Sequence, residues 1–215
     1  MTNKEILSHV DHTLLKAFAT WEQIEKLCNE AIDNGCASVC VPPSYVKKIK
    51  ETFKDRLDIC TVIGFPLGYE TTAGKVADAK QCILDGAAEI DMVVNIAEVK
   101  NGNFEYVEDE IKALREATKG CILKVIIETC YLDENEKIKL CEAVTRAKAD
   151  YIKTSTGFGT AGATLEDIEL FKNNIGPCVK MKAAGGITTV DEVVSYIEAG
   201  CDRIGTSRAV ALLKE

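Results

Sequence analysis

The sequence predicts a (β/α)8 barrel, formed by residues 1–215 as one domain. Eight strand-like runs alternate with amphipathic helical segments, and no low-complexity linker or change in composition divides them. A length of 215 residues is near the lower size limit of this fold. An open doubly wound sheet is the alternative. No G-x-G-x-x-G motif follows the first run, and the glycine pair falls late in the chain, which favours the barrel.

The predicted strands are short runs rich in β-branched and other apolar residues, each bounded by turn-forming residues. They span residues 9–15, 37–41, 58–65, 89–94, 121–129, 151–156, 178–184 and 202–207. Helices are predicted between them. Residues 20–35 and 103–120 carry apolar side chains at helical spacing, each with a glycine just past the end. Residues 164–176 begin with an N-cap threonine and an acidic first turn.

Composition narrows the class of partner. A formal net charge of −8 and a pI near 5.0 argue against a nucleic acid or an anionic membrane as partner. No apolar run approaches the roughly 18 residues of a membrane helix. The ten cysteines are scattered through apolar segments without a C-x-x-C pair, and the opening MTNKEIL does not resemble a secretion signal. We therefore expect reduced, mostly buried cysteines in a cytoplasmic protein.

Metal chemistry has little support in the sequence. The chain has only two histidines, His9 and His12, which would point to opposite faces of an extended segment. A zinc site built on three histidines is excluded, and we interpret both as ordinary polar residues. We expect neither a metal nor an organic cofactor.

Charged residues inside predicted strands are unusual and mark candidate chemistry, because catalytic groups of such barrels lie at the carboxyl ends of strands. These residues are Asp11, Asp91, Lys124, Lys153, Lys180 and Lys182. Lys153 and Lys182 lie on consecutive predicted strands. Neighbouring strands run about 4.8 Å apart, so the two amines can share one pocket. A desolvated lysine beside a second cation loses its proton more readily and can attack an aldehyde to form an imine. The alternative is that Lys153 only pairs with Asp91.

The other two strand lysines receive structural interpretations. Lys180 has the inward parity of Lys182 but lies one layer deeper, so we expect it at the barrel floor. Lys124 and Glu128 share a face of their strand, and we expect them to pair with each other.

Two glycine-containing loops predict a phosphate site. AAGGIT at 183–188 follows the seventh predicted strand, and GTSR at 205–208 follows the eighth. Loops after these strands are the usual phosphate position of (β/α)8 barrels, because glycine lets backbone N–H groups and a helix N-terminus approach the anion.

Several motifs together closely resemble the deoxyribose-phosphate aldolase family, whose members form a Schiff base. They are DHTLLK at 11–16, GFPLG at 64–68, EIDMVVNI at 89–96, LKVIIET at 123–129, IKTSTGFG at 152–159, KAAGGI at 182–187 and RIGTS at 203–207. The resemblance implies reversible cleavage of 2-deoxyribose 5-phosphate to glyceraldehyde 3-phosphate and acetaldehyde, without a cofactor.

The resemblance also implies roles for individual residues. Lys153 would form the imine, Lys182 would favour its neutral form, and Asp91 would relay protons through water. Asp11 would contact substrate hydroxyls or assist that relay. The residues expected to bind the substrate and its phosphate are Thr156, Gly157, Gly185, Gly186, Gly205 and Ser207. Cys40 lies where many members carry a cysteine, and we interpret it as a small buried filler.

The sequence departs from the family pattern at two places. Arg208 stands where members often have a second small hydroxyl residue, and it could hold the phosphate or point to solvent. Longer members end in a tail with a tyrosine that reaches the site, whereas this sequence ends ALLKE. Two alternatives stay open, a different Schiff-base aldolase or transaldolase and a non-catalytic phosphosugar-binding protein. We also expect a homo-oligomer, with a dimer as the first candidate.

Overall fold

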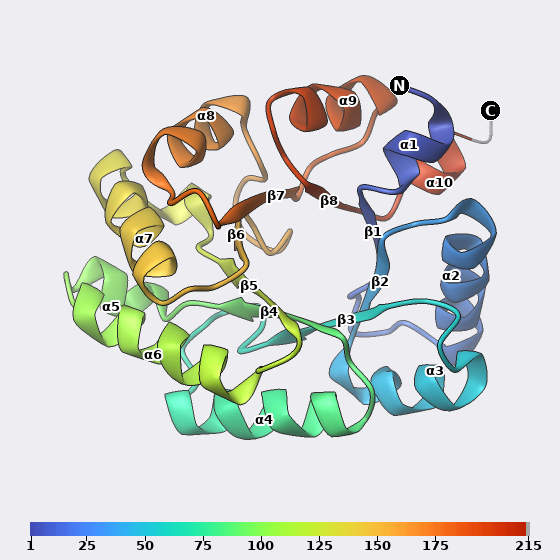
Figure 1. The fold of residues 1–215 in the computed structure, drawn as a ribbon, viewed down its shortest axis with the longest axis horizontal. Helices are drawn as coiled ribbons and strands as arrows, with labels where there is room; N and C mark the ends of the chain where they lie inside the picture. Colours follow the sequence, from blue (N-terminus) through green and yellow to red (C-terminus); the bar gives the residue numbers. More distant parts are fainter. Residues whose placement is uncertain (214–215) are drawn as a thin grey trace.

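The computed structural model describes residues 1–213, in which eight parallel strands close into a barrel in chain order. The strands are β1 (Val10–Thr13), β2 (Ser38–Val41), β3 (Ile59–Ile63), β4 (Glu89–Val93), β5 (Ile122–Ile126), β6 (Tyr151–Lys153), β7 (Lys180–Ala184) and β8 (Arg203–Thr206). The predicted (β/α)8 barrel is confirmed, with the strands at the centre and the helices outside (Figure 1). The last two residues of the ALLKE ending lie outside the described residues.

Every observed strand lies within its predicted run, and each is shorter than that run. The difference has a common cause at β3, β5 and β6. Apolar and β-branched residues continue past the last strand residue into the loops at the carboxyl end of the barrel, as in Thr154–Thr156 after Lys153. The three residues Thr154–Thr156 are still buried.

The helices form the outer layer. They are α1 (Asn3–Leu7), α2 (Trp21–Asn34), α3 (Val46–Phe53), α4 (Thr72–Leu84), α5 (Ile96–Lys100), α6 (Phe104–Ala117), α7 (Glu134–Arg146), α8 (Leu165–Asn174), α9 (Val190–Glu198) and α10 (Ala209–Leu212), with 3-10 turns at Pro43–Tyr45 and Thr129–Tyr131. Of these, α2, α6 and α8 begin where the sequence predicts. Thr20 and Thr164 cap α2 and α8, and Gly35 ends α2 with a φ of 66°. α6 stops earlier than expected, at Ala117, so Gly120 lies beyond its cap.

The apolar core lies between the strands and the helices. Outward-facing strand residues such as Ile90, Met92 and Val125 pack in one cluster with the inner faces of the helices. A smaller cluster joins α1, β1 and α10 through Leu7, Val10, Ala209 and Val210, and these two helices lie side by side in Figure 1. Because the apolar residues face outward, the inner faces of several strands are left for charged side chains.

The register of the sheet sets which inner residues meet. The Cα atoms of Lys153 and Lys182 are direct partners on β6 and β7, and those of Asp91 and Lys124 are partners on β4 and β5. Lys153 is the last residue of β6, at the carboxyl end of the barrel.

Two predictions from composition can be compared with the described residues. Within residues 1–213, no helix is both long and apolar enough to cross a bilayer. All ten cysteines are free thiols, of which Cys178 is exposed.

The two histidines make ordinary polar contacts. The His9 ring contacts the backbone oxygen of Asp202 at 2.9 Å, and the His12 ring contacts Glu30 at 3.0 Å.

Candidate active site

A network of charged side chains fills the barrel interior. Three carboxylates and four cations take part, namely Asp11, Glu89, Asp91, Lys124, Lys153, Lys182 and Arg203. All are buried except Arg203, which is partly exposed at the start of β8. Since buried charges are costly unless paired, a network of this size in a chain of ordinary composition indicates a function.

Lys153 and Lys182 meet at one carboxylate oxygen. Each amine donates to Oδ2 of Asp91, at 2.7 Å in both cases. The contact runs across the barrel, because Asp91 is on β4 and the two lysines are on β6 and β7. Lys153 and Lys182 therefore lie together, as their places on consecutive strands predict, and Lys153 also pairs with Asp91.

The partners of Lys182 keep it charged. Its amine donates to Asp11 at 2.5 Å as well as to Asp91. Burial alone would lower the pKa of Lys182, but these two carboxylates more than offset that effect and hold its pKa well above the usual value. The pKa of Asp91 would likewise be raised by burial, yet Lys124, Lys153 and Lys182 bring it well below its ordinary range. Lys182 is thus a permanent cation beside Lys153.

Lys124 belongs to the same network, which corrects the expected pairing with Glu128. Its amine donates to Glu89 at 2.5 Å and to Asp91 Oδ1 at 2.8 Å. Glu128 instead accepts hydrogen bonds from the hydroxyl and, at 3.2 Å, the N–H of Thr156. It lies beyond the end of β5 with a φ of 55°, so the alternation of the strand no longer sets its direction.

Lys180 lies apart from the network. It is the exposed first residue of β7, at the opposite end of the barrel from the site, and its amine is 5.8 Å from the centre of the Tyr151 ring. A position at the barrel floor matches the expectation for this lysine.

A cavity of about 460 Å³ opens at the carboxyl end of the barrel. Of the network residues, Lys153 lines it, with 3% of its surface exposed. Asp11, Asp91 and Lys182 lie beneath, each with 0% exposed. The cavity is also lined by every residue predicted to bind substrate or phosphate apart from Asp11, namely Thr156, Gly157, Gly185, Gly186, Gly205, Ser207 and Arg208. A small molecule in the cavity can therefore reach the amine of Lys153.

The position of Asp11 favours one of its two expected roles. It is fully buried, accepts a hydrogen bond from Ser38 at 2.9 Å and pairs with Lys182 and Arg203. This geometry favours positioning of Lys182 over direct contact with substrate hydroxyls.

The glycine loop after β7 is shaped by a close backbone approach. Gly185 has a φ of 83°, and a Cβ there would lie 3.1 Å from Gly162 Cα and 3.3 Å from Ser155 Cβ. The carbonyl oxygen of Gly185 accepts a hydrogen bond from Ala163 at 3.2 Å, which ties the loop to the segment after β6. A side chain at Gly185 would thus be both strained and crowded.

Arg208 lies at the rim of this cavity. It is exposed and is the N-cap residue of α10, and its backbone N–H donates to the hydroxyl of Thr206 at 3.2 Å. Arg208 is among the residues that line the cavity, together with Ser207 and Gly186.

Sequence reasoning missed Glu89, Arg203 and the cavity-lining Lys16. The alternation of side chains could have found the first two. Glu89 is two residues before Asp91 and Arg203 two before Gly205, so each shares the inward face of its strand. Both stand at the beginning of a strand-like run, where a charged residue resembles an ordinary boundary.

Comparison with known proteins agrees with this arrangement. Residues 6–208 match the family described as DeoC/LacD family aldolase. The chain is 62% identical over 214 residues to a deoxyribose-phosphate aldolase of Clostridium botulinum (strain Alaska E43 / Type E3), covering 100% of this chain and 97% of that protein. It is 57% identical over 211 residues to one of Clostridioides difficile (strain 630), covering 98% and 96%.

A solved structure has the same fold at lower identity. The deoxyribose phosphate aldolase from Aeropyrum pernix, described as a tetramer, is 33% identical, with a TM-score of 0.92 over 99% of this chain and 91% of that one. The family match spans most of the sequence, and the cavity with its paired lysines lies within the matched residues. The chain therefore belongs to the DeoC/LacD family of aldolases.

Proposed function

We propose that the protein cleaves 2-deoxy-D-ribose 5-phosphate reversibly to D-glyceraldehyde 3-phosphate and acetaldehyde, through a Schiff base on Lys153. The observation that carries the proposal is the pair of buried amines, Lys153 and Lys182, on one oxygen of Asp91 beneath the cavity. The relatives named deoxyribose-phosphate aldolase, which the chain matches over nearly their whole length, support the choice of substrate.

The charge balance of the network favours Lys153 as the neutral amine. Four cations face three carboxylates, so the fully ionised network has one positive charge in excess. Lys182 pairs with two carboxylates and Lys124 with three, whereas Lys153 shares one oxygen of Asp91 with Lys182. A proton lost from Lys153 therefore removes the excess charge and sacrifices the fewest ion pairs.

The reaction begins when the neutral amine of Lys153 attacks the C1 aldehyde of the open-chain sugar. The resulting carbinolamine loses water and becomes a protonated imine. A base then removes the proton of the C3 hydroxyl and the C2–C3 bond breaks. Its electron pair forms the C1–C2 double bond, and the π electrons of the imine move to the nitrogen. Glyceraldehyde 3-phosphate leaves and an enamine stays on Lys153. Protonation of the enamine at C2, followed by hydrolysis, releases acetaldehyde and restores the amine.

Asp91 and Lys182 act on these proton transfers. Asp91 stays ionised because of its lysine partners, and its Oδ2 is 2.7 Å from the reacting nitrogen, within reach of proton transfer directly or through one water. Lys182 keeps a positive charge beside Lys153 and disfavours the protonated amine. Asp11 holds Lys182 in place from the other side. We assign Asp11 as a positioning residue.

The phosphate of the substrate would lie at the rim, against the loops after β7 and β8. Gly157, Gly185, Gly186, Gly205 and Ser207 line this part of the cavity. Their backbone can approach an anion closely, which offsets the unfavourable overall charge of the protein. Thr156 is held by Glu128 at the cavity wall, where we expect it to contact the sugar.

Borohydride trapping tests the proposal. Incubation with acetaldehyde and sodium borohydride should reduce the imine to a stable secondary amine on one lysine. Two lysines, Lys16 and Lys153, line the cavity. Peptide mass mapping should place the modification at Lys153, because the second cation, Lys182, shares an oxygen of Asp91 with it. A modification found solely on Lys16 or Lys182 would refute the assignment of the nucleophile.

Arg208 provides a second prediction. If its guanidinium makes a charge-assisted hydrogen bond to the phosphate, Arg208→Ser should raise KM for the phosphorylated sugar by roughly tenfold, equivalent to about 1.4 kcal/mol of lost binding. Cleavage of unphosphorylated 2-deoxyribose should hardly change. Steady-state kinetics with both sugars measure the effect. An equal effect on both substrates, or none on either, would remove Arg208 from the phosphate site.

The effect of removing metal ions is a third prediction. The proposed steps use an amine, a carboxylate and water, so dialysis against EDTA should leave kcat and KM of the purified protein unchanged or slightly improved. A loss of activity that added Zn²⁺ restores would contradict the mechanism.

For the assembly, we propose a homo-oligomer, since a relative of the same fold is described as a tetramer. Light scattering coupled to size-exclusion chromatography would establish the number of subunits.

A further inference from the structure

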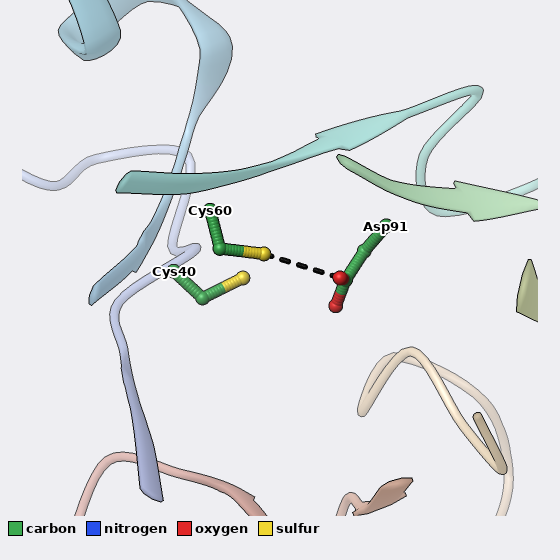
Figure 2. Close-up of side chains that lie close together, drawn as sticks. All are labelled: Cys40, Cys60 and Asp91. Carbon is green, nitrogen blue, oxygen red and sulfur yellow. Dashed lines mark hydrogen bonds between the residues drawn. The ribbon is translucent and has the colours of Figure 1, made fainter. Parts of the chain in front are cut away.

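Two cysteines on neighbouring strands face Asp91 inside the barrel (Figure 2). Cys40 on β2 and Cys60 on β3 are direct partners in the sheet register, with 1% and 0% of their surface exposed. The Cys60 thiol donates to Asp91 Oδ1 at 3.1 Å. One ligand atom from each of the three residues lies within 4.8 Å of the other two. The proposed mechanism uses Asp91 and leaves both thiols without a task.

We propose that Cys40, Cys60 and Asp91 form a binding site for a thiophilic divalent cation such as Zn²⁺ or Cd²⁺, and that the bound cation inhibits the aldolase. Two thiolates and a carboxylate are a donor set suited to these ions. In a tetrahedral site, a metal–sulfur bond of about 2.3 Å and a metal–oxygen bond of about 2.0 Å hold the sulfur and the oxygen about 3.5 Å apart. The observed sulfur-to-oxygen separation of 3.1 Å is close to this value.

Net charge does not oppose binding, although cations surround the site. Each thiol releases one proton when it coordinates, so the entry of a dication leaves the total charge of the interior unchanged. The amine of Lys124 donates to both Cys60 Sγ, at 3.2 Å, and Asp91 Oδ1, at 2.8 Å, so a bound cation would displace it toward Glu89, its partner at 2.5 Å.

The site has an approach from the active-site cavity. Leu15 packs against Cys40, Cys60 and Val62 and also lines the cavity. Lys153, at the cavity floor, contacts Asp91 directly. Leu15 therefore lies between the cavity and the thiols, and its displacement would open a route for an ion.

Inhibition follows from the shared carboxylate, and this part rests on the proposed function. A carboxylate bound to a dication is a weaker proton acceptor, so Asp91 could no longer relay protons for Lys153. Because positioned acid–base groups contribute about a hundredfold or more, saturation with metal should lower kcat by at least about a hundredfold.

Titration with Cd²⁺ under reducing, oxygen-free conditions tests the site directly. The wild-type chain should bind one tight equivalent, measured by calorimetry and by the ultraviolet charge-transfer absorbance of cadmium thiolate. Cys40→Ala and Cys60→Ala should each lose tight binding, and Cys60→Ser serves if an alanine variant does not fold by circular dichroism. Cys82→Ala, at a buried cysteine of α4, and Cys178→Ser, at the exposed one, should bind as the wild type does.

The possible results separate the alternatives. Tight binding that survives Cys60→Ala, or its absence in the wild type, would overturn the site. Binding lost in Cys60→Ala but kept in Cys40→Ala would overturn the assignment, since Asp11, Cys60 and Glu89 form a second group of close donors. Binding without inhibition would refute the inhibitory role alone. If the wild-type chain cleaved no deoxyribose phosphate, the proposed function would fail, yet the titration would still decide the metal site.

Discussion

Replacement of Lys153 by methionine is expected to abolish cleavage of 2-deoxyribose 5-phosphate. The variant lacks the amine that forms the imine, so kcat should fall by roughly 10⁴-fold or more, the scale seen when a covalent nucleophile is removed. Methionine keeps the length and the apolar part of the side chain at this buried position. A coupled assay measures the loss. In it, glyceraldehyde 3-phosphate is isomerised to dihydroxyacetone phosphate, and the reduction of that product by NADH is followed by absorbance.

The control for this variant is Lys180→Met on the adjacent strand. Lys180 is exposed and lies outside the charge network, so this variant should keep the wild-type kcat and KM. Lys153→Met should remain folded, because Asp91 keeps its ion pairs with Lys124 and Lys182. Thermal unfolding checks that point. Residual turnover in Lys153→Met above a hundredth of the wild-type rate would show that another amine forms the imine.

Replacement of Lys182 by methionine is expected to move the pH dependence of the reaction. Lys182 stays protonated across the usual assay range, because its pKa is held well above the ordinary value in the folded protein. Without this charge the protonated form of Lys153 is favoured, and a higher pH is needed to populate the neutral nucleophile. The acidic limb of the profile of kcat/KM against pH should therefore shift upward by about 1 to 3 pH units.

Turnover near neutral pH should fall as a consequence of this shift, by roughly tenfold for each unit. Part of the lost activity should return when the assay is run at higher pH, which a purely structural defect would not allow. Loss of a partner from a buried ion pair costs about 3 to 5 kcal/mol. Here Asp11 keeps Arg203 and Asp91 keeps Lys124, so the variant should be less stable but folded. An unshifted profile would mean that Lys182 acts in another way.

Much of the fold could be predicted from the sequence, because its signals are local. The repeated change from strand-like runs to amphipathic helices indicated the barrel, and caps such as Thr20 and Thr164 marked where helices begin. The closeness of Lys153 and Lys182 was predictable for the same reason. Consecutive strands of such a barrel are neighbours, so positions on two successive strands determine their distance.

The partners of those lysines were decided by the tertiary structure. Asp91 reaches Lys153 and Lys182 across the interior, from a strand that is not a neighbour of either. Strand alternation tells that a side chain points inward, but not how far it extends over the barrel axis or which inward group it meets.

By itself, then, the sequence determined the barrel, the two adjacent lysines and the glycine loops at the cavity rim, since each depends on periodicity or on neighbouring segments. Only the tertiary structure decided that Lys124 pairs with Glu89 and Asp91, and that Glu128 turns to Thr156. The physical reason is the end of β5 at Ile126, because beyond it the backbone leaves the alternation on which the expected pairing of Lys124 with Glu128 relied.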